Sequence, residues 1–268
     1  MPLLVSEAIV LHAFDYLESS RIVRLVTRDG GMRSGLAKGA RKSRRRFGSG
    51  LDLFAQGTAF LHTKTGRDLD TLSGFEDVRT RTELASDLER FHGAETIAEI
   101  ALHFGMDGAD AELFDAIAAA FDALAAKSTR DPREATLAGA WQIVAALGFG
   151  PSLAECAECH TPIGDDEIAL FSHAAGGVLC KRCASLTAGG RKLPAAARAA
   201  IAAWMVGQRV ELLGDTDARA HQRLLREFLS YHLHDGRPLR AYDYWERADW
   251  SAPPRLENRI AEIGNTVG

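Results

Sequence analysis

The sequence predicts a multidomain α+β protein in which a small five-stranded barrel, residues 1–80, precedes an all-helical domain, residues 81–247. Three observations support this class. The first 80 residues contain short runs of β-type composition, the apolar residues that follow recur with a helical period, and two C-x-x-C pairs interrupt that period at residues 151–190. The polar segment 248–268 is expected to form a frayed C-terminal tail.

Five runs in the first 80 residues have the composition of β-strands. They are rich in Val, Leu, Thr and Phe with partial alternation, and turn signals such as Asp29-Gly30-Gly31 separate them. The runs are residues 3–13, 21–28, 32–38, 53–65 and 69–75. Their number and total length suit an OB-fold, a five-stranded Greek-key barrel whose open face and loops bind oligonucleotides. An SH3-like barrel would give a similar pattern, so the strand count alone leaves both open.

After residue 80 the apolar residues recur at the spacing of amphipathic helices. The predicted helices are residues 84–101, 113–124, 131–147, 194–206 and 216–234. The third has Asp131 as N-cap, Pro132 at the first position and Glu134 at the third, which together form a helix start signal. Because the cysteine segment lies between the third and fourth helices, we interpret it as an insertion into the helical domain.

The four cysteines of the chain fall in two C-x-x-C pairs that are separated by twenty residues. Each pair lets one tight turn present two thiolates to the same ion, and the segment between the pairs is long enough to form a hairpin that brings them together. We expect Cys156, Cys159, Cys180 and Cys183 to hold one structural Zn²⁺ per chain, because four thiolates close the tetrahedral shell.

The alternatives to a zinc site are a redox pair or two disulfides. The first ten residues lack the basic and apolar regions of a secretory signal, so we expect the chain to stay in a reducing cytoplasm, where disulfides are rare. His160 and His173 lie between the two cysteine pairs and could serve as ligands. With four thiols available, we interpret both as surface histidines.

Charge is distributed unevenly along a chain whose net charge is −4. Residues 1–80 contain thirteen Lys and Arg against nine Asp and Glu, which gives this unit +4, and the remainder therefore carries −8. An asymmetry of this kind indicates a basic working surface on the first unit.

Six cations fall within nine residues after the third predicted strand. They cannot be core residues because unpaired cations are costly to desolvate, so we expect an exposed loop. A solvated charge run is the plain alternative, but the position of the run in a predicted oligonucleotide-binding barrel favours nucleic acid. The candidate nucleic-acid-binding residues are Lys38, Arg41, Lys42, Arg44, Arg45, Arg46 and Phe47.

Three phenylalanines near this run are candidates for stacking on bases. Phe54 and Phe60 are six residues apart on one predicted strand and share a face, which favours the barrel core for both. Phe47 directly follows the cations, and we expect it to be exposed and available for stacking.

The sequence contains none of the common catalytic or nucleotide-binding motifs that we sought. G-x-x-x-x-G-K-[ST], G-x-G-x-x-G, H-E-x-x-H and G-x-S-x-G are absent, and the clustered carboxylates lie in polar stretches that are typical of solvated charge. We therefore expect no enzyme activity. No stretch approaches the roughly 18 uninterrupted apolar residues of a transmembrane helix, so we also expect no membrane span.

These parts together resemble the family of the bacterial recombination mediator RecO. The resemblance rests on the N-terminal strand pattern, on the K-G-A-R-K sequence at residues 38–42 with Phe47-Gly48 and Leu51-Asp52-Leu53-Phe54 after it, and on the helical domain with its inserted C-x-x-C pairs. It covers roughly residues 1–247. It implies an OB-fold nucleic-acid-binding domain, a helical domain with a zinc module, and a non-enzymatic role in recombinational DNA repair.

The resemblance also implies partners and a nucleoid-associated, cytoplasmic location. Proteins similar to this one bind single- and double-stranded DNA, anneal complementary strands, and with the ring-forming partner RecR help RecA load onto DNA coated by single-strand-binding protein. They bind the acidic, apolar C-terminal tail of that coating protein through the helical domain. The predicted helix at residues 216–234 offers a candidate surface for that tail, or it is an ordinary amphipathic helix. The candidate residues are Arg219, Arg223 and Arg226 beside Leu224, Leu225 and Phe228.

A second hypothesis, from a different class, is a zinc-containing protein-interaction adaptor. The cysteine module would then be the recognition surface, and the basic run would be incidental. The two hypotheses place the working surface on different units of the chain, so they predict different sensitivities to substitution.

Overall fold

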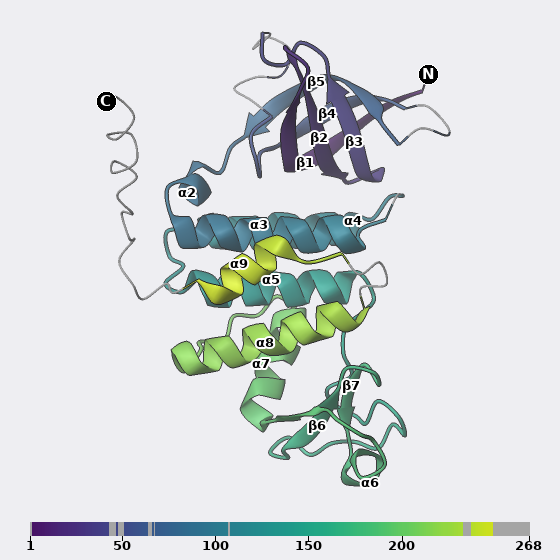
Figure 1. Cartoon of the computed structure of the whole chain (residues 1–268), viewed down its shortest axis with the longest axis vertical. Helices are drawn as coiled ribbons and strands as arrows, with labels where there is room; N and C mark the ends of the chain where they lie inside the picture. The colour runs from purple at the N-terminus through teal and green to yellow at the C-terminus, as the bar shows by residue number, and fades with distance from the viewer. Residues whose placement is uncertain are drawn as a thin grey trace, which may run out of the picture.

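The N-terminal unit is a closed five-stranded barrel at one end of the molecule (Figure 1). The computed structural model describes residues 2–42, 47, 51–63, 66, 68–106, 108–232 and 237–248. The strands are β1 (Leu3–Tyr16), β2 (Ser20–Thr27), β3 (Gly31–Ala37), β4 (Gln56–His62) and β5 (Asp70–Arg79). They close in the order β1-β2-β3-β5-β4, with β3 and β5 parallel and β1 antiparallel to β4. The predicted OB-like barrel is therefore confirmed.

One side of each strand fills the interior of the barrel. Successive side chains of a strand point to opposite faces, so every second residue enters this core. The buried interior residues are Ala8, Val10, Val23, Leu25, Ala37, Phe47, Leu51, Ala55, Ala59, Leu61, Leu72 and Phe75. The opposite faces of β1, β2 and β3 point out of the barrel, where they meet either the helical domain or solvent.

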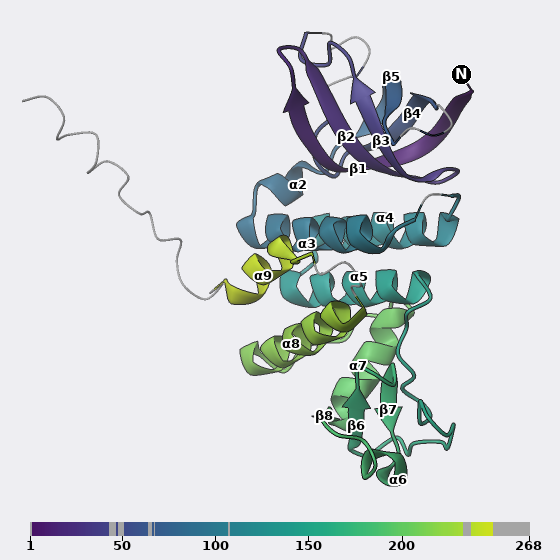
Figure 2. The same cartoon turned by 45° about the vertical axis from the view of Figure 1, so that its right-hand side comes forward.

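The helical domain is stacked beneath the barrel in layers (Figures 1 and 2). Helices α3 (Leu88–Phe104) and α4 (Ala111–Ala125) lie next to the barrel, which α2 (Thr82–Ala85) joins to them. The next layers contain α5 (Pro132–Ala146) with α9 (Arg240–Arg247), and then α8 (Asp215–His232) with α7 (Ala195–Met205). The predicted N-cap of α5 is confirmed, since the Asp131 carboxylate accepts from the backbone N–H groups of Arg133 and Glu134. No helix in the described part of the chain combines the length and apolar character that a bilayer crossing requires.

Helix α9 is an element that the sequence pattern did not indicate. Its two anchors, Tyr242 and Trp245, are fully buried, and the Tyr242 hydroxyl donates to the carbonyl of Gln222 in α8 (2.7 Å). The Glu99 carboxylate of α3 accepts from the backbone N–H groups of Ala241 and Tyr242 (3.1 and 3.0 Å). A cap from a distant helix therefore replaces the local N-cap that a sequence motif would show.

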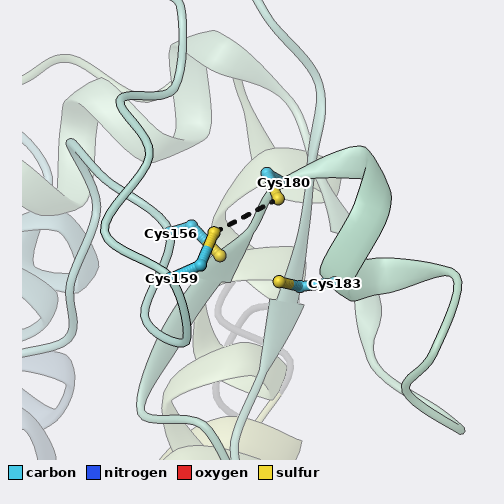
Figure 3. A group of neighbouring side chains, drawn as sticks. All are labelled: Cys156, Cys159, Cys180 and Cys183. Carbon is cyan, nitrogen blue, oxygen red and sulfur yellow. Dashed lines mark hydrogen bonds between the residues drawn. The ribbon is translucent and has the colours of Figure 1, made fainter.

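The cysteine segment forms a small module at the end of the molecule opposite the barrel (Figures 1 and 2). It contains β6 (Ala169–Ser172), β7 (Gly177–Leu179), the short helix α6 (Lys181–Ala184) and β8 (Arg191–Leu193), with the strands in the order β7-β6-β8. Its four cysteines lie side by side (Figure 3). The predicted arrangement, a cysteine module inserted between helices, is confirmed.

The barrel and the helical domain share one apolar core. Ile9 and Leu11 of β1, Val26 of β2 and Met32 of β3 are buried in the same cluster as α3 and α4. Phe54 belongs to this cluster too, with its ring centroid 5.0 Å from that of Phe121. The prediction that Phe54 shares a strand with Phe60 is wrong, because Phe54 lies before β4 with φ of +66°.

The β2–β3 turn fits closely against the connection between α3 and α4. Gly31 has φ of +68°, and a Cβ at this position would lie 2.1 Å from the Gly108 carbonyl oxygen. The Met32 N–H donates to the Met106 carbonyl (3.1 Å), and the Gly108 N–H donates to the Gly30 carbonyl (3.2 Å). Only glycine meets both the backbone conformation and the space at residue 31.

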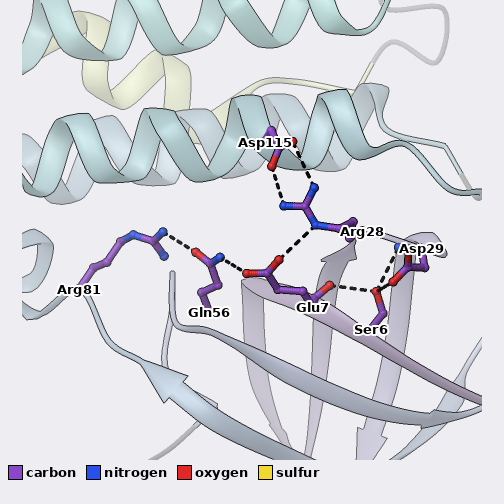
Figure 4. A network of polar contacts seen from close by, with 7 residues as sticks. All are labelled: Ser6, Glu7, Arg28, Asp29, Gln56, Arg81 and Asp115. Carbon is purple, nitrogen blue, oxygen red and sulfur yellow. Dashed lines mark hydrogen bonds and ion pairs between the residues drawn. The ribbon is translucent and has the colours of Figure 1, made fainter.

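A polar network borders this apolar core (Figure 4). The Arg28 guanidinium donates to both carboxylate oxygens of Asp115 in α4 (3.1 and 2.6 Å) and to Glu7 (3.1 Å). Glu7 also accepts from Gln56 (2.6 Å), whose carbonyl accepts from Arg81 (2.7 Å). The network therefore joins Arg28 of the barrel and Arg81 at the start of α2 in one chain of hydrogen bonds along the interface.

Arg81 is the buried anchor of this interface, and its side chain is only 1% exposed. It donates to the Phe54 carbonyl (2.8 Å), to Gln56 and to the Asp122 carboxylate of α4 (2.7 Å). Replacing Arg81 would leave a buried carbonyl and a side-chain amide without their donors, which costs folding stability. Most ion pairs on the surface, by contrast, contribute little to stability.

We expect Arg81→Ala to lower the free energy of unfolding by about 2–4 kcal/mol. The matched control is Arg79→Ala, which removes a second guanidinium from the same Asp122 but from a side chain that is 59% exposed. The control is expected to cost less than about 1 kcal/mol. Urea unfolding followed by circular dichroism measures both, and equal losses in the two variants would contradict the assignment of Arg81 as the anchor.

Candidate metal centre and nucleic-acid interface

The four cysteine thiols form one cluster (Figure 3). Their Sγ atoms all lie within 4.8 Å of one another, and those of Cys159 and Cys180 are 3.7 Å apart. A tetrahedral ion with metal–sulfur bonds of about 2.3 Å would separate its ligands by about 3.8 Å. The chain therefore positions four cysteines to bind a metal ion.

Local backbone geometry delivers each pair to the cluster. In the first pair, the Cys156 N–H donates to the Thr161 carbonyl and the His160 N–H donates to the Cys156 carbonyl (both 2.8 Å), which closes a tight turn. In the second pair, Cys180 follows β7 and is the N-cap residue of α6, and the Ala184 N–H donates to its carbonyl (2.8 Å). A bond from the Ala157 N–H to the Val178 carbonyl (2.8 Å) connects the two turns.

The electrostatics of the four thiols favour a bound cation. Hydrogen bonds from Thr161 lower the pKa of Cys159 to about 6, which favours its thiolate form. The hydrogen bond between Cys183 and Cys159 raises the pKa of Cys183 to about 12, because a second thiolate beside the first is unfavourable. A cation removes this conflict, and soft thiolates suit zinc or another thiophilic metal.

Two polar anchors attach the module to the helical domain. The buried Arg198 guanidinium of α7 donates to the carbonyls of Leu153, Gly164 and Asp165 (3.3, 2.5 and 2.8 Å). Glu227 of α8 accepts from Arg191 in β8, as close as 2.5 Å. The helices therefore hold the segments that flank both cysteine pairs.

The two histidines of the segment lie outside the cysteine cluster. His160 is exposed and lies 3.0 Å from Glu155. His173 is partly buried rather than on the surface, and it lies 3.3 Å from Glu227. The interpretation of His173 as a surface histidine is thus wrong, because Glu227 and the ring of Phe228 enclose it.

The described part of the basic segment begins directly after β3 and lies against the tip of the β1–β2 hairpin. Lys38, Arg41 and Lys42 are exposed, and the Arg41 N–H donates to the carbonyl of Ser19 (3.1 Å). The Arg41 guanidinium lies 3.7 Å from Asp15. The structure thus places these three cations together on the barrel, whereas Arg44, Arg45 and Arg46 lie outside the described residues.

Phe47 is not an exposed stacking residue. It is 2% exposed and packs in the barrel core with Leu51 and its neighbours, so the prediction of an exposed Phe47 is wrong. Burial of this large apolar side chain in the barrel core is more favourable than its exposure to solvent beside the cations. The aromatic residues of the barrel that are exposed are Phe14 (45%) and Tyr16 (41%) on β1, which the sequence analysis did not single out. Phe14 and Tyr16 are two residues apart, and this spacing in a strand would have predicted that both rings lie on the same face.

Two family models cover most of the chain. Residues 1–81 match the model of the recombination protein O N terminal, and residues 85–241 match the model of the recombination protein O C terminal. The chain belongs to the RecO family. The boundary between the two matches coincides with the passage from β5 to α2, where the barrel ends and the helices begin.

Curated members of the RecO family are similar over nearly the whole chain. The DNA repair protein RecO of Anaeromyxobacter sp. (strain K) is 37% identical over 242 residues, which cover 87% of this chain and 92% of that relative. The DNA repair protein RecO of Gloeobacter violaceus is 30% identical over 236 residues, or 84% of this chain and 85% of that relative. The chain is thus a DNA repair protein of this family, as the resemblance predicted.

Helix α8 does not offer the apolar surface that the sequence suggested for a partner's tail. Leu224, Leu225 and Phe228 are at most 2% exposed and pack inside the helical domain. Arg226 is bound to Glu246 of α9 (2.7 Å), and Arg219 to Asp215 (2.8 Å). The prediction of an exposed apolar surface on this helix is therefore wrong. The helix is an ordinary amphipathic helix whose apolar face packs in the core.

We expect Cys156→Ser to lose the metal and several kcal/mol of folding stability, because the buried sulfur closes the shell. The matched control is His160→Asn, which changes an exposed neighbour and should retain one ion per chain. Mass spectrometry of the metal content and thermal unfolding measure the two effects. A folded wild-type protein without metal, or a Cys156→Ser protein with unchanged metal and stability, would contradict the metal centre.

Proposed function

We propose that this RecO-family chain is a non-enzymatic recombination mediator that binds single-stranded DNA through its barrel and anneals complementary strands. The observation that carries the proposal is the position of Lys38, Arg41 and Lys42. They are exposed on the OB-like barrel at the start of a segment with six cations, in a unit of charge +4. The rest of the chain carries −8 and would repel a polyanion.

The proposed activity follows from contacts that are mainly ionic. Each phosphate that a cation neutralises releases counterions, which gives affinity without base preference. A protein that shields phosphates lowers the repulsion between two approaching strands, and base pairing then supplies the driving force for annealing. Arginine suits this task because its planar guanidinium binds phosphate oxygens in pairs and stacks on bases.

The metal in this proposal is one structural Zn²⁺ per chain. Cys156, Cys159, Cys180 and Cys183 would hold it in a closed shell of four thiolates, which leaves no position for a substrate. When bound, it supplies a crosslink between the two turns of the module rather than a reactive water. The role of the module is then to present a rigid surface at the end of the molecule that is distant from the barrel.

The proposed partners are single- and double-stranded DNA, RecR and the C-terminal tail of single-strand-binding protein. RecR and the tail come from membership of the RecO family, in which the mediator helps RecA load onto coated DNA. A cytoplasmic, nucleoid-associated location is part of the same proposal. Because the basic segment and the cysteine module lie at opposite ends of the molecule, DNA and a protein partner could bind at the same time without competing for one surface.

Salt dependence of DNA binding tests the proposed surface. On oligonucleotides of unrelated sequence, the logarithm of the binding constant should fall with the logarithm of salt concentration by about 0.7 per phosphate contact. We expect the triple variant Arg44→Ala, Arg45→Ala, Arg46→Ala to bind more weakly and to reduce the slope by up to about 2. Fluorescence anisotropy with labelled single strands measures the slope.

The matched control for this test removes three exposed cations from the opposite end of the molecule. The variant Lys181→Ala, Arg182→Ala, Lys192→Ala changes the net charge by the same amount and should keep the wild-type slope. Wild-type binding without salt dependence, or equal losses in the two triple variants, would show that the barrel segment is not the DNA surface.

The adaptor hypothesis remains the second candidate because Lys181 and Arg182 are exposed beside the cysteine cluster, with the Lys181 side chain 90% exposed. Survival of DNA damage in cells that carry each triple variant separates the two functions. The mediator proposal expects loss of survival in the Arg44–Arg46 variant and normal survival in the Lys181 variant. The reverse result, with partner capture lost only in the Lys181 variant, would favour the adaptor.

A further inference from the structure

A β-bulge in β1 changes which residues face out of the barrel. Val10 pairs with Leu25 and His12 pairs with Arg24, so Leu11 is an extra residue in the ladder. Ile9, before the bulge, and Leu11, at the bulge, both point outwards and are buried against the helical domain. After it, the outward positions are His12, Phe14 and Tyr16, which extend beyond the helices.

These three residues, the aromatic row, form an exposed strip along the distal half of β1. The rings of His12 and Phe14 are 5.7 Å apart, and Phe14 and Tyr16 are 45% and 41% exposed. Phe14 is paired with Ile22 of β2, which in turn is paired with Leu36 of β3. The row therefore lies on an apolar band that crosses three strands on the outer surface of the barrel.

One end of the aromatic row meets the basic segment. Tyr16 is paired with Ser20 at the hairpin tip, and the backbone of Arg41 is hydrogen-bonded to the adjacent Ser19 (3.1 Å). The exposed side chains of Lys38, Arg41 and Lys42 therefore begin next to this end of the row.

The other end of the aromatic row opens into a cleft of about 470 Å³ between the barrel and the helical domain. His12, Arg24, His103, Arg237 and Arg240 line it. The Arg24 side chain has no hydrogen bond or ion pair with any described residue, and burial together with the nearby charge of Arg237 lowers its pKa. Like charges held together in this way favour a bound anion.

Two carboxylates also line the cleft, but both have partners. Glu99 accepts from the first backbone N–H groups of α9, and Glu95 lies 3.0 Å from His92. Three arginines face these two carboxylates in the cleft, so its lining keeps a net positive charge.

We propose that the aromatic row is a stacking platform for single-stranded DNA, with Phe14 and Tyr16 each taking one base and Arg24 binding a phosphate at the cleft. This inference rests on the proposed function and identifies the base-contacting residues of the same barrel surface. A ligand with alternating π-faces and negative charges matches a strip of exposed rings that has cations at both ends.

The spacing of the row selects single strands. Side chains two residues apart on a strand are separated by about 6.8 Å, whereas stacked bases in a duplex rise by about 3.4 Å. Bases on Phe14 and Tyr16 must therefore be separated from each other, which an unpaired strand permits and a duplex does not. The platform thus holds a single strand with its bases separated, so that they can pair with a complementary strand.

The test compares an oligo(dT) strand with an abasic oligonucleotide of the same length, which keeps the phosphates and lacks the bases. Phe14→Ala with Tyr16→Ala should weaken binding of oligo(dT) at least roughly tenfold, because a lost stacking contact costs about fivefold or more. The salt slope should stay unchanged, and affinity for the abasic strand should equal that of the wild type. Phe14→Tyr with Tyr16→Phe should restore binding of oligo(dT).

The matched control is Tyr231→Ala, which removes a comparably exposed aromatic residue (54%) from α8 and should leave both affinities unchanged. Thermal unfolding confirms that the variants are folded. The inference is overturned if the double variant binds oligo(dT) like the wild type, or if it loses the same factor on the abasic strand. It is also overturned if the variant loses only binding of an acidic peptide, since the face would then serve a protein partner. Absence of salt-dependent binding in the wild type would instead refute the proposed function itself.

Discussion

The arrangement of this molecule depends on the buried interface between the barrel and the first helical layer. Ile9, Leu11 and Phe54 of the barrel unit pack in the core of the helical domain. Arg81 donates to the polar groups that this burial would otherwise leave without partners. Because the interface covers Ile9 and Leu11 in the middle of the outer face of β1, the face is open at the two ends of the strand, and the end beyond the bulge is the one that lies beside the basic segment. The same contact that joins the two units therefore determines where the barrel can meet a ligand.

Charge adds a second constraint to this geometry. The unit that carries the open face is positive, and the unit that covers the remainder is negative. A polyanion is consequently attracted to the barrel and repelled from the helical layers, at separations within a Debye length of about 8–10 Å. The cysteine module lies at the opposite end of the molecule from the barrel, so a ligand on the barrel leaves the surface of the module free for other contacts.

Much of this organisation could be predicted from the sequence where chemistry acts locally. The spacing of Cys156, Cys159, Cys180 and Cys183 allows few arrangements, and alternation and turn residues located the five strands. The errors concern side chains whose environment is set by distant segments. Phe47 follows a run of cations yet fills the barrel core, and α9 is capped by Glu99 from another helix. No local pattern records either contact, because each depends on how the two units pack.

The central claim is that DNA lies on the barrel end of the molecule. Photocrosslinking of the full chain to a 4-thiothymidine oligonucleotide, with the crosslinked peptides identified by mass spectrometry, tests it most directly. The account predicts crosslinks in residues 12–24 and 38–47. Crosslinks concentrated in residues 151–193, with the barrel peptides unmodified, would contradict it.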